Sequence, residues 1–351
     1  MIILTKDDLR SSIEAATGGN VTVLYDDKGY PSYMAVIPKF TIESVFGSSD
    51  YGSGIHPAFI VNGIERSEIF IGQYEAMVVD GRACSLPGQP PITSVDFDQA
   101  KAYCSSKGSN WHLMTNWEWA AIALWCLKNG FQPRGNTNYG QAYNATYETG
   151  LRIDGGAPGD TSGQGSTKTG SGPASWRHNN TFSGISNLVG NIYEWIDGFK
   201  IVDGKMYMPS DNNYSLDDES YPEVLDDQNP QVNVKFDSTD ADDGNGGSSG
   251  HSIISDTITN VLTTGYNTGT WKSISIKEAY TPPDILYQAC IVPFDTDNPV
   301  GSINIKNYGE RMLRRGGSYA YGSGCGLFAM SLNLQRDATG SRAGFRPVFI
   351  A

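Results

Sequence analysis

The sequence is poor in basic residues and has no long apolar run, and each shortage excludes a class of protein. Lys and Arg number 25 against 38 Asp and Glu, which gives a net charge of −13, so a phosphate backbone is repelled. No uninterrupted apolar stretch reaches the roughly 18 residues of a membrane span, and the opening residues lack the basic and apolar regions of a signal peptide. We therefore expect no nucleic-acid partner, no membrane insertion and no signal peptide.

Cysteine is also scarce. The five cysteines, Cys84, Cys104, Cys126, Cys290 and Cys325, form no C-x-x-C pair, and an odd number cannot pair completely within one chain. We expect mostly buried free thiols in a reducing compartment, and no zinc site. The H-E-x-x-H and G-x-S-x-G motifs are missing, so a metalloprotease or serine hydrolase of these kinds has no support.

What is abundant is glycine, with 41 residues, together with 19 Tyr and 7 Trp. This composition is typical of a loop-rich protein with aromatic contact surfaces. Charged residues make up only 18% of the chain, which argues against wholesale disorder.

Two helices and several short strands are indicated. After Ser94, Phe97, Ala100 and Cys104 share one helical stripe. A second helix begins at Thr115 with a capping box, in which the Thr115 hydroxyl and the Glu118 carboxylate satisfy each other's backbone amides. Short alternating runs, typical of strands, occupy residues 21–25, 33–38 and 68–74. This order predicts an α+β fold rather than a doubly wound sheet.

Changes in composition divide the chain. Residues 1–58 read as a small N-terminal module and residues 59–351 as the main domain. Between about 201 and 300 the chain carries acidic turns that alternate with strand-like runs at 231–236, 252–262 and 273–276. We interpret this stretch as a β-rich insertion.

A set of motifs follows in a fixed order through the main domain. They occupy residues 69–75, 91–97, 100–104, 111–120, 187–195, 315–319 and 344–346. In this order they closely resemble the formylglycine-generating enzyme (sulfatase-modifying factor) family. The resemblance covers about 59–351, interrupted by the insertion, and implies a C-type-lectin-like α+β domain.

The family's oxidase chemistry has to be tested at its own residues. Its enzymes carry two cysteines soon after an R-G-G-S motif, and these thiols bind copper. Here Tyr321 stands three residues after Ser318, and Cys325 stands seven residues after it. One thiol cannot supply a two-thiolate copper site, so a copper-dependent oxidase is the alternative interpretation and not the leading one.

The segment from about 313 to 351 resembles something else more closely, namely the variable region of proteins diversified by diversity-generating retroelements. In those systems the adenines of a template repeat are randomised during reverse transcription. The resemblance implies thirteen randomised, ligand-binding positions. They are Ser318, Tyr319, Ala320, Tyr321, Gly324, Ser331, Asn333, Leu334, Asp337, Ala338, Gly340, Ser341 and Arg342.

The residue types at these positions agree with the assignment. A codon whose third base is a fixed C, and whose first two bases are free, encodes neither Lys, Glu, Gln, Met nor Trp. None of these five residue types occurs at the thirteen positions.

The same segment separates physically into a frame and a surface. Its glycines permit tight backbone paths, and Leu327, Phe328 and Leu332 can fill the core. Outward side chains would then form the contact surface, with Tyr supplying rigid area and Ser and Asn adaptable hydrogen bonds. The side chains expected to point outward are Tyr319, Tyr321, Ser331, Asn333, Asp337 and Arg342. Tyr319 has a second interpretation, as half-buried scaffold.

The segment 187–195 has two interpretations. In the resembling family the corresponding turn helps to hold a calcium ion, which implies Val189, Asn191 and Glu194 as ligands of a structural calcium. Tyr193 and Trp195 are more simply core aromatics. We expect no cofactor to be required.

The sequence therefore predicts a non-enzymatic recognition protein with a hypervariable surface. It resembles variable proteins of bacteriophages and prophages, which implies a place in the virion at the tail tip, after synthesis in the bacterial cytoplasm. The ligand would be a bacterial surface protein or glycan. The N-terminal module would attach the chain to other tail or fibre subunits, and a homotrimer would fit such an assembly. A cellular surface adhesin of the same fold is a further alternative.

Overall fold

The computed structural model describes residues 6–247, 250–296 and 300–351. Residues 1–5 of the expected N-terminal module, and residues 248–249 and 297–299 of the expected insertion, lie outside these ranges. The α-helices of the described ranges are α1 (Lys6–Thr17), α2 (Ile42–Phe46), α3 (Phe97–Ser105), α4 (Asn116–Lys128) and α5 (Asp284–Gln288). None of them is long and apolar enough to span a bilayer.

The two predicted helices form where the sequence places them. At the start of α4 the amide of Glu118 donates to Thr115 Oγ1 (3.3 Å), and the amide of Thr115 donates to Glu118 Oε2 (2.8 Å), which confirms the capping box. Helix α3 begins two residues later than Ser94 suggested, because Asp96 forms a capping box with Gln99. Ser94 instead has a left-handed backbone, with φ of 60°.

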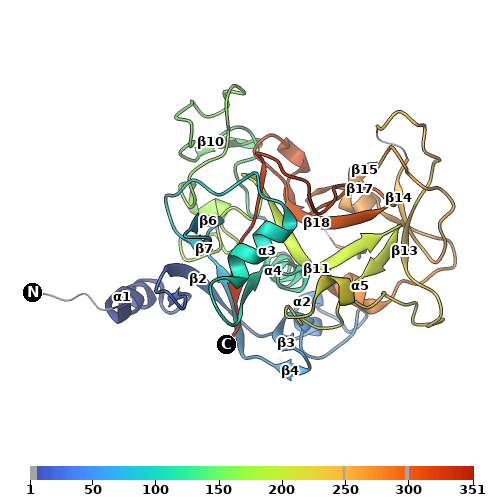
Figure 1. Cartoon of the computed structure of the whole chain (residues 1–351), viewed down its shortest axis with the longest axis horizontal. Coiled ribbons are helices and arrows are strands. Elements are labelled where there is room, and N and C mark those ends of the chain that lie inside the picture. Colours follow the sequence, from blue (N-terminus) through green and yellow to red (C-terminus); the bar gives the residue numbers. More distant parts are fainter. Residues whose placement is uncertain (1–5, 248–249, 297–299) are drawn as a thin grey trace, which may run out of the picture.

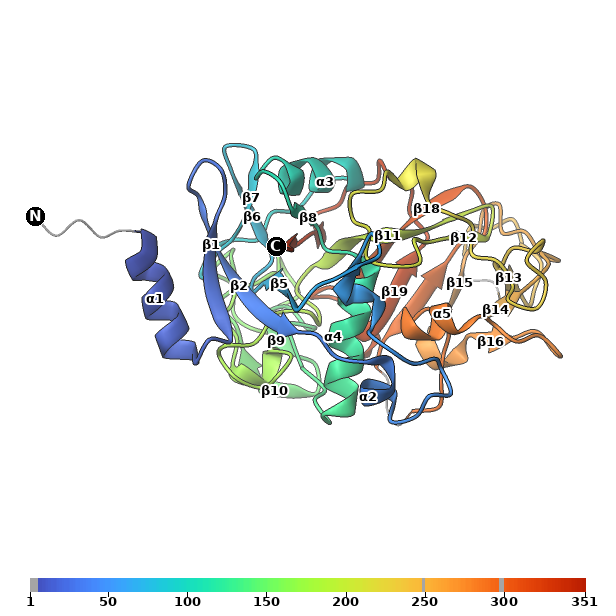
Figure 2. The same cartoon turned by 90° about the horizontal axis from the view of Figure 1, so that it is seen from below.

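A five-stranded antiparallel sheet forms one side of the molecule (Figure 2). Its strands, in spatial order, are β1 (Val21–Tyr25), β2 (Pro31–Pro38), β5 (Glu68–Gly72), β21 (Pro347–Phe349) and β8 (Trp111–Leu113). The final strand, β21, therefore lies inside the sheet, between β5 and β8.

A ten-stranded mixed sheet forms the other side (Figures 1 and 2). In spatial order it contains β15 (Asn267–Thr270), β17 (Ser302–Ile305), β19 (Gly326–Leu332), β18 (Glu310–Gly316), β11 (Tyr193–Val202), β12 (Lys205–Tyr207), β13 (Lys235–Ser238), β14 (Ser252–Ser255) and β16 (Ser275–Ile276), with β20 (Ala343–Gly344) paired to β11. Separate hairpins are β3 (Ile60–Val61) with β4 (Ile64–Glu65), β6 (Ala76–Val79) with β7 (Arg82–Ser85), and β9 (Gln141–Ala142) with β10 (Ala145–Thr149).

Helix α4 lies between the two sheets and carries the main core (Figure 2). Trp119 and Ile122 of this helix belong to one buried cluster with Ile71 of β5, Phe199 of β11 and Met330 of β19. A helix that is apolar around most of its circumference has to be buried on all sides. The mixed helices and strands confirm the α+β prediction.

The expected boundary after residue 58 is not a structural boundary. Strand β2 pairs with β5 from Met34 opposite Gly72 to Pro38 opposite Glu68, and α1 packs against β1 at the sheet edge. The hairpin of β1 and β2 covers the edge that β5 would otherwise expose. Residues 21–38 are thus part of the main domain rather than of a separate N-terminal module.

The stretch 201–300 carries short strands, but most of it is loop and turn, and it does not form a separate body. Strands β12, β13, β14 and β16 extend the ten-stranded sheet beyond β11, while β15 extends it at the opposite end. Because each of these strands continues an existing ladder, the insertion adds to both ends of the same sheet.

Candidate ligand-binding surface

Two antiparallel strands, β18 and β19, form the frame of the predicted variable region. Arg314 lies opposite Ser331, and Arg315 lies opposite Met330. On its other side β19 pairs in parallel with β17, where Ile303 lies opposite Met330. Strand β19 is thus held between two neighbours, and every residue in it is buried.

Two glycines fix the path of the chain between these strands. Gly317 has a φ of 90°, and a Cβ built on it would lie 2.6 Å from Cys325 Sγ. A Cβ on Gly326 would lie only 1.9 Å from the carbonyl oxygen of Val300. Neither position has room for a side chain, so both glycines belong to the frame.

Ten of the thirteen predicted variable residues are exposed or half-buried. The exposed ones are Tyr321, Asp337, Ser341 and Arg342, and the half-buried ones are Ala320, Gly324, Asn333, Leu334, Ala338 and Gly340. They occupy two segments, 320–324 before β19 and 333–342 after it. The structure therefore places most of the predicted contact residues in two loops joined by one buried strand.

The other three residues are buried, and the prediction that Tyr319 and Ser331 point outward is wrong. Ser318 is 0% exposed, Ser331 2% and Tyr319 3%. The ring of Tyr319 packs edge-on against Tyr139, with centroids 5.2 Å apart. Ser331 Oγ accepts a hydrogen bond from Arg314 Nη2 (3.0 Å). Tyr319 is more deeply buried than the half-buried scaffold of its second interpretation, because Tyr139 in the loop before β9 packs on it.

Aromatic rings and arginines support the exposed residues. Tyr321 rests edge-on against Tyr193, with centroids 5.3 Å apart, and the Arg314 guanidinium lies 4.8 Å from the Tyr193 ring centre and 5.2 Å from that of Trp195. Arg342 lies 5.2 Å from the ring centre of Tyr319. Sequence reasoning missed Arg314, which is half-buried in β18 and lies over the rings of Tyr193 and Trp195.

The second loop is fastened to fixed parts of the chain through its backbone. The amide of Ser94 donates to the carbonyl of Gly340 (3.0 Å), and the amide of Phe97 donates to that of Arg336 (3.0 Å). Leu334 and Ala338 pack against the buried cluster around Phe97. These contacts hold the backbone of 333–342, while Asp337, Ser341 and Arg342 stay exposed.

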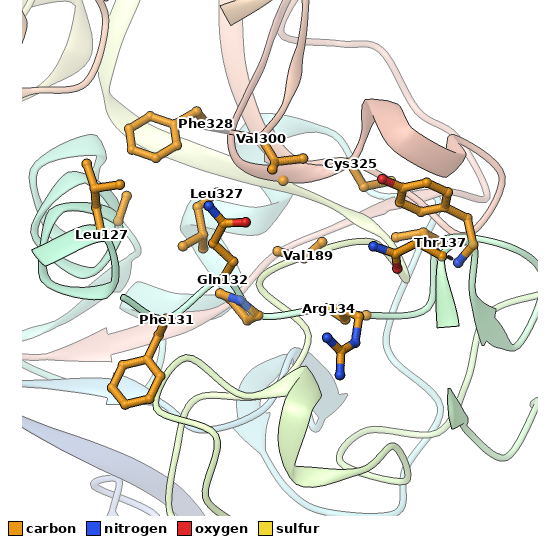
Figure 3. A pocket seen from close by; sticks show the side chains of 16 residues that line it. Leu127, Phe131, Gln132, Arg134, Thr137, Val189, Val300, Cys325, Leu327 and Phe328 are labelled. Carbon is orange, nitrogen blue, oxygen red and sulfur yellow. Dashed lines mark hydrogen bonds between the residues drawn. The ribbon is translucent and has the colours of Figure 1, made fainter. Parts of the chain in front are cut away.

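A small apolar pocket lies beside the first loop (Figure 3). It has a volume of about 80 Å³ and is lined by side chains that include Leu127, Phe131, Val300, Leu327 and Phe328. A cavity of about 150 Å³ holds a benzene molecule, so this one can take a group of only a few carbon atoms. Cys325 also lines it, which places the pocket next to the residues expected to vary.

The Cys325 thiol is poorly suited to chemistry. It is 1% exposed and donates to the carbonyl of Ser318 (3.1 Å). Burial raises the pKa of this thiol to about 12, whereas reactive cysteines have a lowered pKa. All five cysteines of the chain are buried and free, and Tyr321 occupies the place of the enzymes' first thiol.

Two of the three residues predicted to hold calcium, Asn191 and Glu194, direct their oxygens at protein donors instead. Both carboxylate oxygens of Glu194 accept hydrogen bonds from Arg346, at 2.7 and 2.9 Å. Asn191 Oδ1 accepts from Asn136 Nδ2 (3.0 Å) and from the amide of Thr167 (2.7 Å). These oxygens are engaged by protein donors, so the donor set does not fit a cation.

A buried acid completes this polar network. Glu75 is 0% exposed and accepts from Asn187 Nδ2 (2.8 Å) and Asn191 Nδ2 (2.7 Å). Burial, together with the nearby Glu194 charge, raises the pKa of Glu75 to about 8. A buried carboxyl without its own cation favours the protonated form.

This raised pKa predicts a pH effect on stability. An unfolded Glu titrates near pH 4.5, so between about pH 4.5 and 8 the folded state binds more protons than the unfolded state. The contribution of Glu75 to stability is complete below pH 4.5 and is lost as the pH rises towards 8, by at most about 1.4 kcal/mol per pH unit. We expect Glu75→Gln to gain stability relative to the unmodified protein as the pH rises from 5 to 8, measured by urea unfolding. An equal pH dependence of both proteins would contradict this assignment.

Comparisons with known proteins bear on the fold. A family model described as "Sulfatase-modifying factor enzyme 1-like domain" matches residues 65–241, about half of the chain. Among curated protein sequences, none matches significantly.

Two solved structures are distantly similar. One is described as Treponema denticola variable protein 1, with 12% identity, a TM-score of 0.36, and coverage of 94% of this chain and 99% of the other. The second is PvdO from Pseudomonas aeruginosa, with 14% identity, a TM-score of 0.35, and coverage of 94% and 98%. Likeness at this distance does not bear on function.

Proposed function

We propose that this chain, which belongs to the sulfatase-modifying factor enzyme 1-like family, is a non-enzymatic ligand-binding protein with a diversified surface. The supporting observation is the separation of frame and surface in residues 313–351. The frame consists of the wholly buried strand β19 and of glycines that have no room for a side chain. The surface consists of two loops, which hold ten of the thirteen predicted variable residues. Such a frame tolerates exchange of the loop side chains without rearrangement of the backbone.

The oxidase alternative has little support from the donor atoms present. A two-thiolate copper site needs a second sulfur, and the position that would supply it holds Tyr321. The remaining thiol, on Cys325, is buried and protonated at neutral pH because its pKa is raised to about 12. The residues present do not fit copper.

The proposed setting follows from the sequence. The variable positions would be rewritten by a retroelement, and the protein would sit at a phage tail tip, attached to other tail or fibre subunits near its N-terminus. The ligand would be a bacterial surface protein or glycan. Display in several copies, for example in a homotrimer, would let weak single contacts add up to firm attachment. A cellular surface adhesin is the alternative setting.

An exchange of loop residues tests the contact surface. The four exposed variable residues, Tyr321, Asp337, Ser341 and Arg342, are replaced together by those of a sibling variant. We expect the pattern of binding to a panel of intact bacterial strains to change, while the free energy of unfolding stays within about 1 kcal/mol because these residues bury little. Flow cytometry of labelled protein gives the binding, and urea unfolding gives the stability.

A matched control uses exposed residues outside the variable region. Tyr147 is 82% exposed and Leu151 58%, and replacing both by alanine should leave the binding pattern as it was. If the exchange of the loops also leaves it as it was, these loops are not the contact surface. The gene's surroundings test the setting: a reverse transcriptase gene and a near-copy of the 3′ end, differing at adenines, would support diversification.

A further inference from the structure

A large groove with mixed polar and apolar lining lies apart from the small pocket and adjoins the second variable loop. Its volume is about 990 Å³, within the range of ligand sites in proteins. One wall is α3, with Ala102 and Ser105, the floor is β8, and the other wall is the segment 214–219. Arg336, between the variable residues Leu334 and Asp337, closes one end.

The wall formed by 214–219 is fixed at both ends. Just before it, the buried Asn212 donates to Glu118 Oε1 (2.9 Å) and accepts from Thr115 Oγ1 (2.7 Å). At its far end Asp218 pairs with Lys101 and Lys200, each at 3.3 Å, and with Arg336. Because these contacts already hold the walls in place, binding a ligand requires little loss of conformational entropy in the protein.

The floor and the wall meet at an aromatic stack. The rings of His112 and Tyr214 are parallel within 6°, and their centroids are 3.8 Å apart. His112 is held by Glu118 Oε1 at 2.7 Å and by the carbonyl of Asn110 at 3.2 Å. The stack therefore presents Tyr214 as a rigid, amphipathic plate beside the groove.

The polar lining suits a ligand rich in hydroxyl groups. Ser105, Ser109, Asn110 and Ser215 line the groove around the Tyr214 plate. Aromatic plates pack against the apolar faces of sugar rings, while hydroxyl and amide groups hydrogen-bond to their edges. Ala102, Leu113 and Leu216 also line the groove, so apolar surface lies beside these hydroxyl and amide groups, as the two faces of a sugar ring require.

The negative charge of the groove favours some classes of sugar over others. Five acidic residues line it, Asp98, Asp197, Asp217, Asp218 and Glu219, against the two cations Lys101 and Arg336. Lys101 and Arg336 are already paired with some of these carboxylates. The excess of negative charge disfavours a sulfated or uronic-acid chain and favours neutral or amino sugars.

We propose that this groove binds a saccharide chain of neutral or amino sugars, as a fixed subsite beside the variable loop. The proposal rests on the proposed function and narrows its ligand to a glycan. The groove, whose residues do not vary, binds a stretch of sugars that many bacterial surfaces share. The neighbouring variable residues 337–342 contact the parts of the glycan that differ between surfaces. Because Arg336 both lines the groove and precedes Asp337, one chain can reach both parts.

Titration calorimetry on the full chain tests the subsite, with chitotriose, its de-N-acetylated counterpart, maltotriose and a sulfated chondroitin tetrasaccharide as probes. We expect at least one of the first three to bind and the sulfated one not to bind. Tyr214→Ala should weaken binding at least tenfold, and Tyr214→Phe should keep it within about twofold. Ala102→Trp places an indole in the groove from an exposed helix position, so it should abolish binding and keep the fold.

Tyr147→Ala is the matched control, since it removes an exposed tyrosine on β10, far from α3 (Figures 1 and 2). Failure of all three uncharged or amino probes, tighter binding of a lysine-rich peptide, or binding untouched by Ala102→Trp would overturn the proposal. Exchange of the variable loops should leave binding of these short probes intact. If the short probes do not bind but the loop exchange changes the pattern of bacterial strains bound, the groove proposal fails and the proposed function stands.

Discussion

Replacing Arg346 by methionine is expected to lower the free energy of unfolding by about 3–5 kcal/mol. Arg346 is 0% exposed, and its guanidinium donates to both oxygens of Glu194, to the carbonyl of Gly72 (2.8 Å) and to that of Ser186 (2.9 Å). Methionine fills a similar volume but leaves a buried carboxylate and two carbonyls without these donors. Urea unfolding at pH 7 measures the loss.

Two further variants identify the cause of that loss. Arg342→Met makes the same chemical change at an exposed position and should cost little. Combining Arg346→Met with Glu194→Gln should recover part of the stability, because the unpaired buried charge is then removed. A loss below about 1 kcal/mol in the single variant would show that the pair does not hold the core as described.

Replacing Gly326 by alanine should have the second large effect, a loss of about 3 kcal/mol or more. Its Cβ would lie 1.9 Å from the carbonyl oxygen of Val300 and 2.9 Å from the amide of Gly301. Both are backbone atoms, so the clash can be relieved only by separating the chain before β17 from β19. Thermal and urea unfolding measure the effect.

A glycine in the variable region supplies the matched control. A Cβ on Gly340 meets nothing within 4 Å, so Gly340→Ala should leave the unfolding free energy within about 0.5 kcal/mol. Together, Gly326→Ala and Gly340→Ala apply the same substitution to a frame position and to a variable-loop position. Equal losses at both positions would contradict that division.

Much of the fold could be predicted from local signals. The capping box of Thr115 and Glu118 marks the start of α4, because it combines two side chains that serve each other's amides. The run 68–74 predicts a strand, and β5 forms there with faces that differ in burial. The ordered motifs indicated the family whose model matches residues 65–241.

The errors come from contacts between distant residues. Ser331 reads as an outward residue of a strand, yet Arg314, 17 residues earlier, packs over it and donates to its hydroxyl. Glu194 reads as a cation ligand, yet Arg346, 152 residues later, holds both its oxygens. No local pattern indicates that β2 pairs with β5 or that the insertion extends both ends of one sheet, because such pairing depends on tertiary packing.

The central place of β21 has a consequence for chains that are truncated near the C-terminus. A frameshift or premature stop within 318–342 would remove Pro347–Phe349, the strand that joins β5 to β8. The nascent chain would then keep two unpaired strand edges and an open core, which invites proteolysis. A chain without its last few residues is therefore expected to be degraded instead of accumulating as a folded protein.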